Sequence, residues 1–387
     1  MVTGSGDQSD PSREDGRYFP QSPKEAIVPE TVSEPPKKKR ESHPLLVVIN
    51  GLLSLAIFGV ILAGIGLYLG KQRFDARGPL EQDKTVLVER GATLGSIAAR
   101  LENEGVITDA LLFRAGVRAM RQENTLKAGE YAFPAGVSMA GVLEKIASGK
   151  SVQYQVTLPE GLTSFQIVER LRQEPLLVGE VAEIPAEGSL LPDTYAFTRG
   201  TDRAEIIRRM KASHDRILEQ VWENRADDLP ISTPDELVTL ASIVEKETGQ
   251  SDERGKVAGV FVNRLNQGIR LQSDPTIIYG ITNGRGGLGR GIRRSEIDGY
   301  TPYNTYQIDG LPPTPIANPG RLSLEAVANP EETDALFFVA DGTGGHAFSV
   351  TYEEHNRNVR RWREIEAERR RAAEEAAAND GDAATSN

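Results

Sequence analysis

A long, uncharged apolar run near the N-terminus constrains the fold of this chain most strongly. It covers residues 45–70, and as a helix it would measure about 39 Å, which is enough to cross a bilayer with some tilt. Residues 37–40 before it are all Lys or Arg, and the basic residues after it are fewer. Because basic residues favour the cytoplasmic side, we predict a single-pass anchor with its N-terminus in the cytoplasm and the bulk of the chain outside.

Composition excludes several classes of function. The 387 residues include no cysteine, so disulfides, thiol catalysis and thiolate metal sites are unavailable. The formal net charge is −11, so the chain lacks the excess of basic residues that binds nucleic-acid phosphates. We therefore predict no nucleic-acid partner. A hydrophobic content of 39% is sufficient for the cores of at least two domains.

Shifts in composition divide the chain into six segments. The first, residues 1–44, combines prolines with mixed charges and has no periodic pattern, so we predict a disordered cytosolic tail. The others are a transmembrane helix (45–70), a charged connector (71–85), a small module (86–152), a larger domain (153–362) and a charged helical and disordered tail (363–387).

Periodicity predicts a mixed α+β fold for the two folded parts. In the small α/β module we expect strands at 85–88 and 128–133 and helices at 93–103, 111–120 and 138–148. In the larger domain we expect strands at 154–158 and 335–340, helices at 203–222, 256–265 and 352–361, and a loop-rich segment at 272–320. The charged residues after 362 most simply extend the last helix as a solvated face.

The best-marked helix of the larger domain begins at Thr233. Thr233 is a suitable N-cap, Pro234 fits the first helical position, and Glu236 can bond back to the cap. Apolar residues then cover most of the circumference, which predicts a buried helix. Glu245 and Glu247 near its end are costly on such a helix and indicate a function.

Helical geometry separates these two glutamates. At about 100° per residue, Glu247 lies roughly 60° from the middle of the apolar face, and Glu245 lies roughly 100° from it on the other side. Only one of them can comfortably line a given cleft.

Seven blocks in and after this helix carry a resemblance to a known family. They are residues 241–248, 260–265, 271–279, 302–306, 310–320, 328–330 and 338–348. In order and spacing they resemble the endolytic murein transglycosylases of the YceG-like family. The resemblance is weaker upstream and does not cover the first 44 residues or the C-terminal tail.

The resemblance implies a lytic transglycosylase with Glu247 as its catalytic acid. Such an enzyme cleaves the MurNAc–GlcNAc bond of peptidoglycan and leaves 1,6-anhydroMurNAc ends, and one carboxyl group can act first as acid and then as base. Apolar surroundings would raise the pKa of Glu247 and keep it protonated. A structural carboxylate paired with arginine is the alternative for this residue.

The resemblance also implies a location and partners. It places the protein in the cell inner membrane with its catalytic domain in the periplasm, acting on nascent glycan strands, with peptidoglycan synthases as possible partners. The small module is similar to a LysM-like module. The sequence favours equally a module that binds glycan and one that only acts as a spacer between the membrane and the larger domain. We predict neither a metal nor another cofactor, because His346 and His355 lack a third ligand pattern and fit structural roles near the cleft.

Polar residues in two of the blocks are candidates for binding the substrate. The residues from 272 to 276 lie on a predicted turn and can form hydrogen bonds with sugar hydroxyls. The residues from 303 to 305 provide an apolar tyrosine ring with neighbouring polar side chains. The candidates are Gln272, Ser273, Asp274, Thr276, Tyr303, Asn304 and Thr305. A turn capped by Asp274 and a buried tyrosine bonded to the backbone are equally good interpretations.

The sequence leaves open one alternative for the catalytic acid and two alternatives for the function. Glu245 can be the acid, or can position a neighbour by a salt bridge. A hydrolytic muramidase would use Asp274 as a second carboxylate. A non-catalytic, membrane-anchored scaffold would bind peptidoglycan without cleaving it.

Overall fold

The computed structural model describes residues 44–385, so the predicted cytosolic tail lies outside the described residues except for Pro44. The chain divides into two units at Gly70. Helix α1, Pro44–Asp75, has a mean hydropathy of 2.7 over its most apolar window and is long enough to cross a membrane. It continues past the predicted span, so the first part of the predicted connector is helical. A Lys71–Asp75 ion pair of 2.6 Å stabilises this extra turn.

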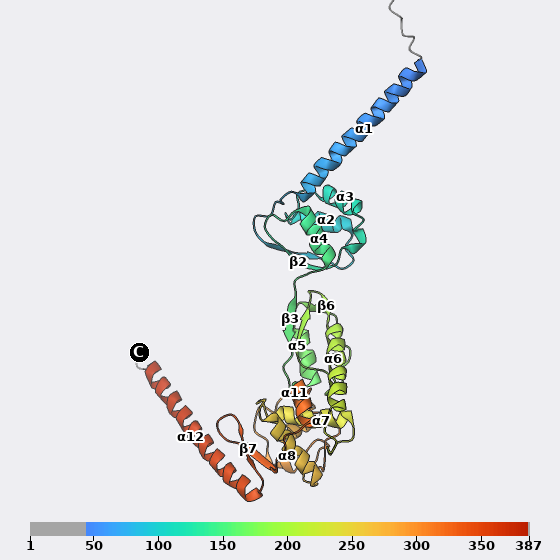
Figure 1. Cartoon of the computed structure of the whole chain (residues 1–387). Coiled ribbons are helices and arrows are strands. Elements are labelled where there is room, and N and C mark those ends of the chain that lie inside the picture. The colour runs from blue at the N-terminus through green and yellow to red at the C-terminus, as the bar shows by residue number, and fades with distance from the viewer. Residues whose placement is uncertain (1–43, 386–387) are drawn as a thin grey trace, which may run out of the picture. The chain divides into compact units, whose positions relative to one another are not determined.

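The small module contains a two-stranded antiparallel sheet and three α-helices, in the predicted order (Figure 1). Its elements are β1 (Lys84–Val88), α2 (Leu94–Asn103), α3 (Ala110–Ala119), β2 (Gly129–Phe133) and α4 (Met139–Ser148). Their apolar faces enclose a separate core around Tyr131, Phe113 and Phe133, each 0% exposed. The likeness to a LysM module stays a prediction.

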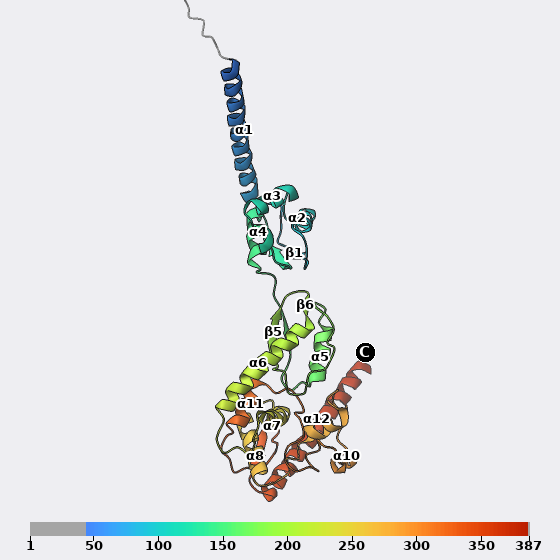
Figure 2. The same ribbon diagram turned by 90° about the vertical axis from the view of Figure 1, so that its right-hand side faces the viewer.

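The larger domain begins with short strands and two helices around its own core. Strand β3 (Tyr154–Thr157) pairs with β5 (Thr194–Phe197) antiparallel, and β4 (Leu177–Val178) pairs with β6 (Thr201–Asp202) in parallel. Helices α5 (Ser164–Gln173) and α6 (Arg203–Glu223) accompany these strands. Figure 2 shows α5 and α6 beside the strands.

Three helices form the centre of the larger domain, and the acidic helix is one of them. They are α7 (Pro234–Glu247), α8 (Arg254–Asn266) and α11 (Arg321–Ala328), and each packs against the other two. The predicted start of α7 is confirmed, because Thr233 and Glu236 form a capping box. The side chains of Leu237, Leu240 and Val244 are 0% exposed, so α7 is buried as the pattern indicated.

The segment predicted as loop-rich contains two helices that the sequence analysis missed. Helix α9, Asp274–Thr282, begins directly after Ser273 and has a proline in its first turn. The residues expected on a simple turn therefore occupy the start of a helix. Helix α10, Arg294–Asp298, is short and exposed.

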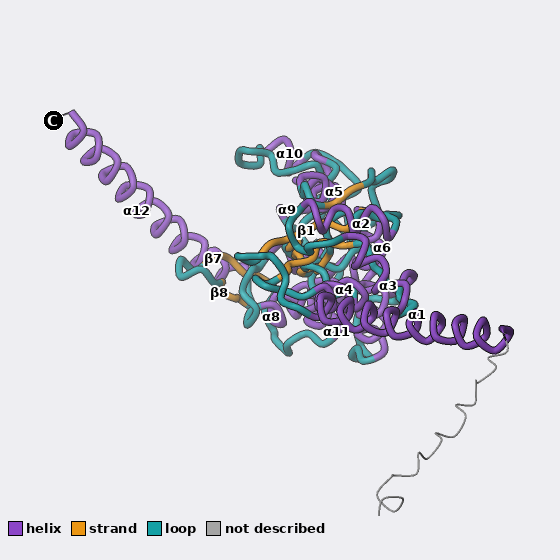
Figure 3. The backbone as a smooth tube through the Cα atoms, turned by 90° about the horizontal axis from the view of Figure 1, so that it is seen from above, coloured by secondary structure: helices purple, strands orange, loops and turns teal. Residues whose placement is uncertain are grey.

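A hairpin and a long helix end the chain. Strand β7 (Phe337–Ala340) pairs antiparallel with β8 (His346–Ser349), and α12 (Tyr352–Thr385) packs against both strands. Figure 3 shows this orange hairpin beside the purple helix. The structure confirms the predicted α+β class with one apolar N-terminal helix, and the charged residues after 362 do extend the last helix.

Candidate active site

Glu247 is the last residue of α7, and its carboxyl group is held by a residue from another part of the chain. Ser273 Oγ donates a hydrogen bond of 2.5 Å to Glu247 Oε1. Ser273 is itself 1% exposed, and its backbone N–H bonds to Thr305 Oγ1 at 2.9 Å. The hydroxyl that contacts Glu247 is therefore fixed in position.

Burial raises the pKa of Glu247 to about 7, and this is the largest influence on the group. The negative charge of Asp274 adds to the increase. The hydrogen bond from Ser273 and the charges of His346 and Arg264 act in the opposite direction. A carboxyl group with this pKa is protonated in a large fraction of molecules at neutral pH, and it can both donate and accept a proton.

Two cavities adjoin the side chain of Glu247. The first, of about 380 Å³, is called the aromatic cavity here, and its lining includes Phe337, Phe338, Tyr306, Tyr352 and His355. The second, of about 280 Å³, is called the glycine-loop cavity and is lined by Gly342, Gly344, Gly345, Trp362 and Arg369. Glu247, Ala340 and His346 belong to the walls of both.

Glu245 lies in a different environment, although only one residue separates it from Glu247. Its side chain is 5% exposed and pairs with Arg254 at 3.4 Å. The other carboxylate oxygen accepts hydrogen bonds from Gly320 N at 3.0 Å and from Ser323 Oγ at 2.6 Å. These contacts connect the end of α7 to α8 and α11, as expected of a structural carboxylate.

Two of the predicted substrate-binding residues line the aromatic cavity. Gln272 is exposed and has a φ of 53°, an uncommon value for a residue with a side chain. Asp274 accepts a hydrogen bond of 2.8 Å from the hydroxyl of Tyr306. Both residues therefore line the same cavity as Glu247.

Three other predicted binding residues lie beneath this surface. Thr276, Asn304 and Thr305 are each 0% exposed. Thr276 and Thr305 bond to each other at 2.9 Å, and Asn304 Nδ2 donates to three backbone carbonyls near α10. In this structure the three side chains support the cavity surface from below, and their contact with a sugar stays a prediction.

Tyr303 is outside both cavities that contain Glu247. Its ring packs against Tyr279 with centroids 4.9 Å apart, and its hydroxyl bonds to Thr314 Oγ1 at 2.8 Å. The neighbouring Tyr306 is the tyrosine of this block that reaches the cavity wall.

Two further wall residues, which the sequence analysis did not assign to substrate binding, come from distant segments. Arg264 is 7% exposed and donates to the carbonyls of Leu336 and Leu271. His346 bonds through Nδ1 to Glu253 Oε2 at 2.7 Å. The sequence carried a signal for both residues, because each belongs to a family block, and His346 was also expected to lie near the cleft.

A cavity of larger volume than the aromatic and glycine-loop cavities lies elsewhere. It measures about 570 Å³ and is lined by α8 and the segments around Asp228 and Glu331. It contains several acidic and amide side chains but neither Glu247 nor an aromatic residue. Among the side chains of residues 44–374, no group of three or more His, Asp or Glu is arranged to hold a metal ion.

The fold and the site define a class of α+β protein in which an acidic side chain of raised pKa lies between two open cavities. Residues 86–361 match the YceG-like family. The chain belongs to that family.

Relatives of known name and one solved structure are similar to this chain. The endolytic murein transglycosylase of Bacillus subtilis is 30% identical over 77% of this chain and 90% of that protein. The protein of the same name from Streptococcus pneumoniae is 30% identical over 82% of this chain, which spans 65% of that relative's length. A crystal structure of a putative YceG-like protein from Listeria monocytogenes is 31% identical, covers 71% of this chain and 99% of its own, and has a TM-score of 0.43.

Proposed function

We propose that this protein is a lytic transglycosylase that cleaves the MurNAc–GlcNAc bond within peptidoglycan glycan strands. The observation that carries the proposal is the position of Glu247, whose pKa of about 7 coincides with access from two cavities. The names of the relatives support the substrate, since they are endolytic murein transglycosylases.

Glu247 acts first as a general acid in the proposed reaction. Its proton passes to the oxygen that bridges MurNAc C1 and the next GlcNAc, and the C1–O bond breaks with its electron pair remaining on that oxygen. Positive charge develops at C1 and the ring oxygen, and the carboxylate left at Glu247 faces this charge. Protonation requires the raised pKa that burial produces.

The same carboxylate then acts as the base. It removes the proton from the 6-hydroxyl of the muramoyl residue, and O6 forms a bond to C1. The product is a 1,6-anhydro end, Glu247 is protonated again, and no water is consumed. The hydrogen bond from Ser273 holds one oxygen of Glu247 in place, so the other oxygen carries the proton in both steps.

The alternative of a hydrolytic muramidase assigns a different role to Asp274. In that reaction Asp274 would act as a nucleophile or activate water. Asp274 lines the same cavity as Glu247 and is bonded to Tyr306, so the nature of the products distinguishes the two reactions.

We further propose that α1 anchors the enzyme in the cell inner membrane, with the N-terminus in the cytoplasm and the catalytic domain in the periplasm. The helix has the length and composition of a single span, and basic residues precede it in the sequence. The anchor would keep the site close to nascent glycan strands, where membrane-bound peptidoglycan synthases are candidate partners.

The test uses the full chain in detergent with un-crosslinked glycan strands, and mass spectrometry of the products. Wild-type protein should generate 1,6-anhydro ends, whereas Glu247→Gln should generate none. Glu325→Gln is the matched control, because Glu325 pairs with Arg321 on the exposed side of α11. Reducing ends would favour the muramidase, and binding without any cleavage would favour the scaffold.

A further inference from the structure

The two cavities beside Glu247 have a consequence for how a glycan strand binds. An enzyme that cuts within a strand must hold sugars on both sides of the bond that it breaks. The aromatic cavity and the glycine-loop cavity share Glu247, Ala340 and His346. A strand that passes Glu247 can therefore occupy one cavity with each of its two halves.

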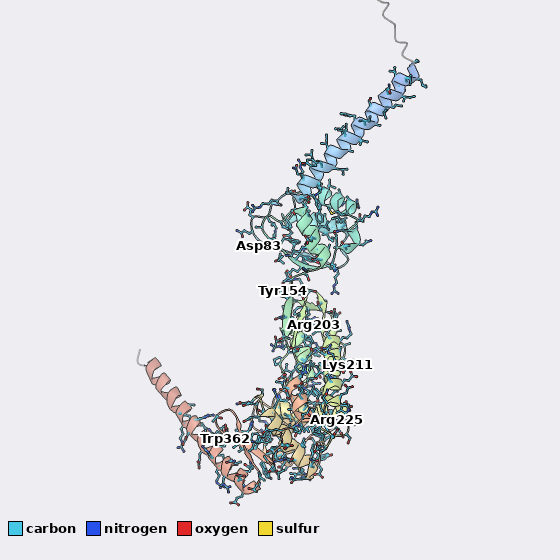
Figure 4. All side chains as sticks on the ribbon, in the orientation of Figure 1. Asp83, Tyr154, Arg203, Lys211, Arg225 and Trp362 are labelled. Carbon is cyan, nitrogen blue, oxygen red and sulfur yellow. The ribbon has the colours of Figure 1, made fainter. Side chains whose placement is uncertain are left out.

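The glycine-loop cavity is closed on one side by the C-terminal helix. Trp362 and Arg369 of α12 line it together with glycines of the β7–β8 turn. Figure 4 labels Trp362 on α12, beside the hairpin. The sequence pattern had indicated only a solvated face after residue 362, but the helix forms a wall of this cavity.

Contacts on both sides hold the glycine-rich turn in place. Arg369 donates a hydrogen bond to the carbonyl of Gly342, and a Cβ at Gly342 would lie 3.0 Å from the side chain of Ile365. From the opposite side, Gln250 donates to Gly344 O at 2.7 Å. Because the turn already packs closely against α12, the cavity exists without a substrate.

Trp362 has the properties of a sugar platform. A partly exposed indole offers a large, rigid apolar face that suits the apolar face of a pyranose, and it loses little conformational entropy on binding. The aromatic cavity has a corresponding residue in Tyr352, which is 66% exposed. Tyr352 and Trp362 lie on the same helix, about 15 Å apart along its axis.

We propose that Trp362 binds a sugar of the glycan strand on one side of the cleaved bond, and that the strand runs past Glu247 from the Tyr352 side to the Trp362 side. This inference rests on the proposed function, because it assumes a glycan substrate. It assigns a binding role to α12, which the family resemblance did not cover beyond its first turns.

The chain contains two tryptophans, which allows a direct test. Trp222 is distant in sequence from the site residues, on α6, and its ring lies 3.8 Å from the guanidinium of Arg225. In a full-length Trp222→Phe, Glu247→Gln protein, Trp362 is the remaining tryptophan, which can be excited at wavelengths that tyrosine does not absorb, and the glycan is not consumed. Titration with un-crosslinked glycan strands should change its emission with saturation. Binding seen by co-sedimentation with unchanged emission would overturn the proposal.

Kinetics of the active enzyme provide a second test. Trp362→Ala should lower kcat/KM for anhydro-end formation by about tenfold or more, mainly through KM, while Trp362→Phe keeps most of the activity. The pH dependence should stay that of wild type, because Glu247 keeps its neighbours. Unchanged kcat/KM in Trp362→Ala would reject the binding of a sugar at Trp362 and leave the proposed function intact. If the wild-type protein formed no anhydro products, the proposed function itself would be rejected.

Discussion

Ser273 donates its hydroxyl hydrogen to Glu247 across a separation of 26 positions in the chain, with 2.5 Å between the two oxygens. This contact joins the end of α7 to the start of α9. It orients the carboxyl group and opposes the effect of burial on its pKa, so the proton affinity of Glu247 depends on residues that flank the cleft.

The rate should fall at alkaline pH. Glu247 must be protonated to donate, and its pKa is about 7. We therefore expect kcat/KM for anhydro-end formation to decrease about tenfold per pH unit above that value. The measurement is a pH series on un-crosslinked strands, with protein stability recorded at each pH. A flat profile to pH 9 would contradict the assignment.

Removal of the Ser273 hydroxyl should move this profile to higher pH. The hydrogen bond favours the charged form of Glu247 and lowers its pKa. In Ser273→Ala the pKa of Glu247 rises, and the decline in kcat/KM begins at a more alkaline pH than in wild type. Ser189→Ala is a suitable control, because its hydroxyl bonds to Ala186 O outside the site.

Neutralising Asp274 should have the opposite effect. Its negative charge raises the pKa of Glu247, so Asp274→Asn should shift the profile to lower pH and keep the anhydro product. The asparagine Oδ1 can still accept the hydrogen bond from Tyr306. Complete loss of cleavage in this variant, with Asp298→Asn fully active, would instead support Asp274 as a second catalytic carboxylate.

Glu247→Gln should stabilise the fold at neutral and alkaline pH. The folded-state pKa of Glu247 is raised from 4.5 to about 7, so ionisation of this group weakens the folded state as the pH rises between those values. The stability gained by the variant should therefore be absent below about pH 4, grow through this window and level off above pH 7, at on the order of 3 kcal/mol. The measurement is the melting temperature of the wild-type and Glu247→Gln full chains in detergent across this pH range, and the difference between them should follow this course.

Replacement of Glu245 should affect stability more than chemistry. Glu245→Ala leaves Arg254, which is 7% exposed, without its buried partner, and we expect a loss of about 3 kcal/mol in the free energy of unfolding. Glu245→Gln keeps an acceptor oxygen for Gly320 or Ser323, so it should lose less and still form anhydro ends. If this glutamine variant were folded and inactive, Glu245 would become the candidate acid.

The sequence by itself determined the elements whose signals are local. Helical periodicity and the capping box predicted α7, and the uncharged run predicted α1. The position of Glu247 on a buried helix followed from the same pattern, because the spacing of apolar residues fixes which face of a helix is inside. The mixed α+β class followed from the order of such patterns.

Only the tertiary structure decided which side chains surround Glu247. Thr276, Asn304 and Thr305 belong to the same blocks as Gln272 and Asp274, yet they are fully buried, since exposure depends on segments that are distant in the sequence. Long-range packing likewise brings residues of α8, the β7–β8 hairpin and α12 to the cleft, among them Arg264, His346 and Trp362. No local periodicity encodes such contacts, because they arise from the packing of whole elements against one another.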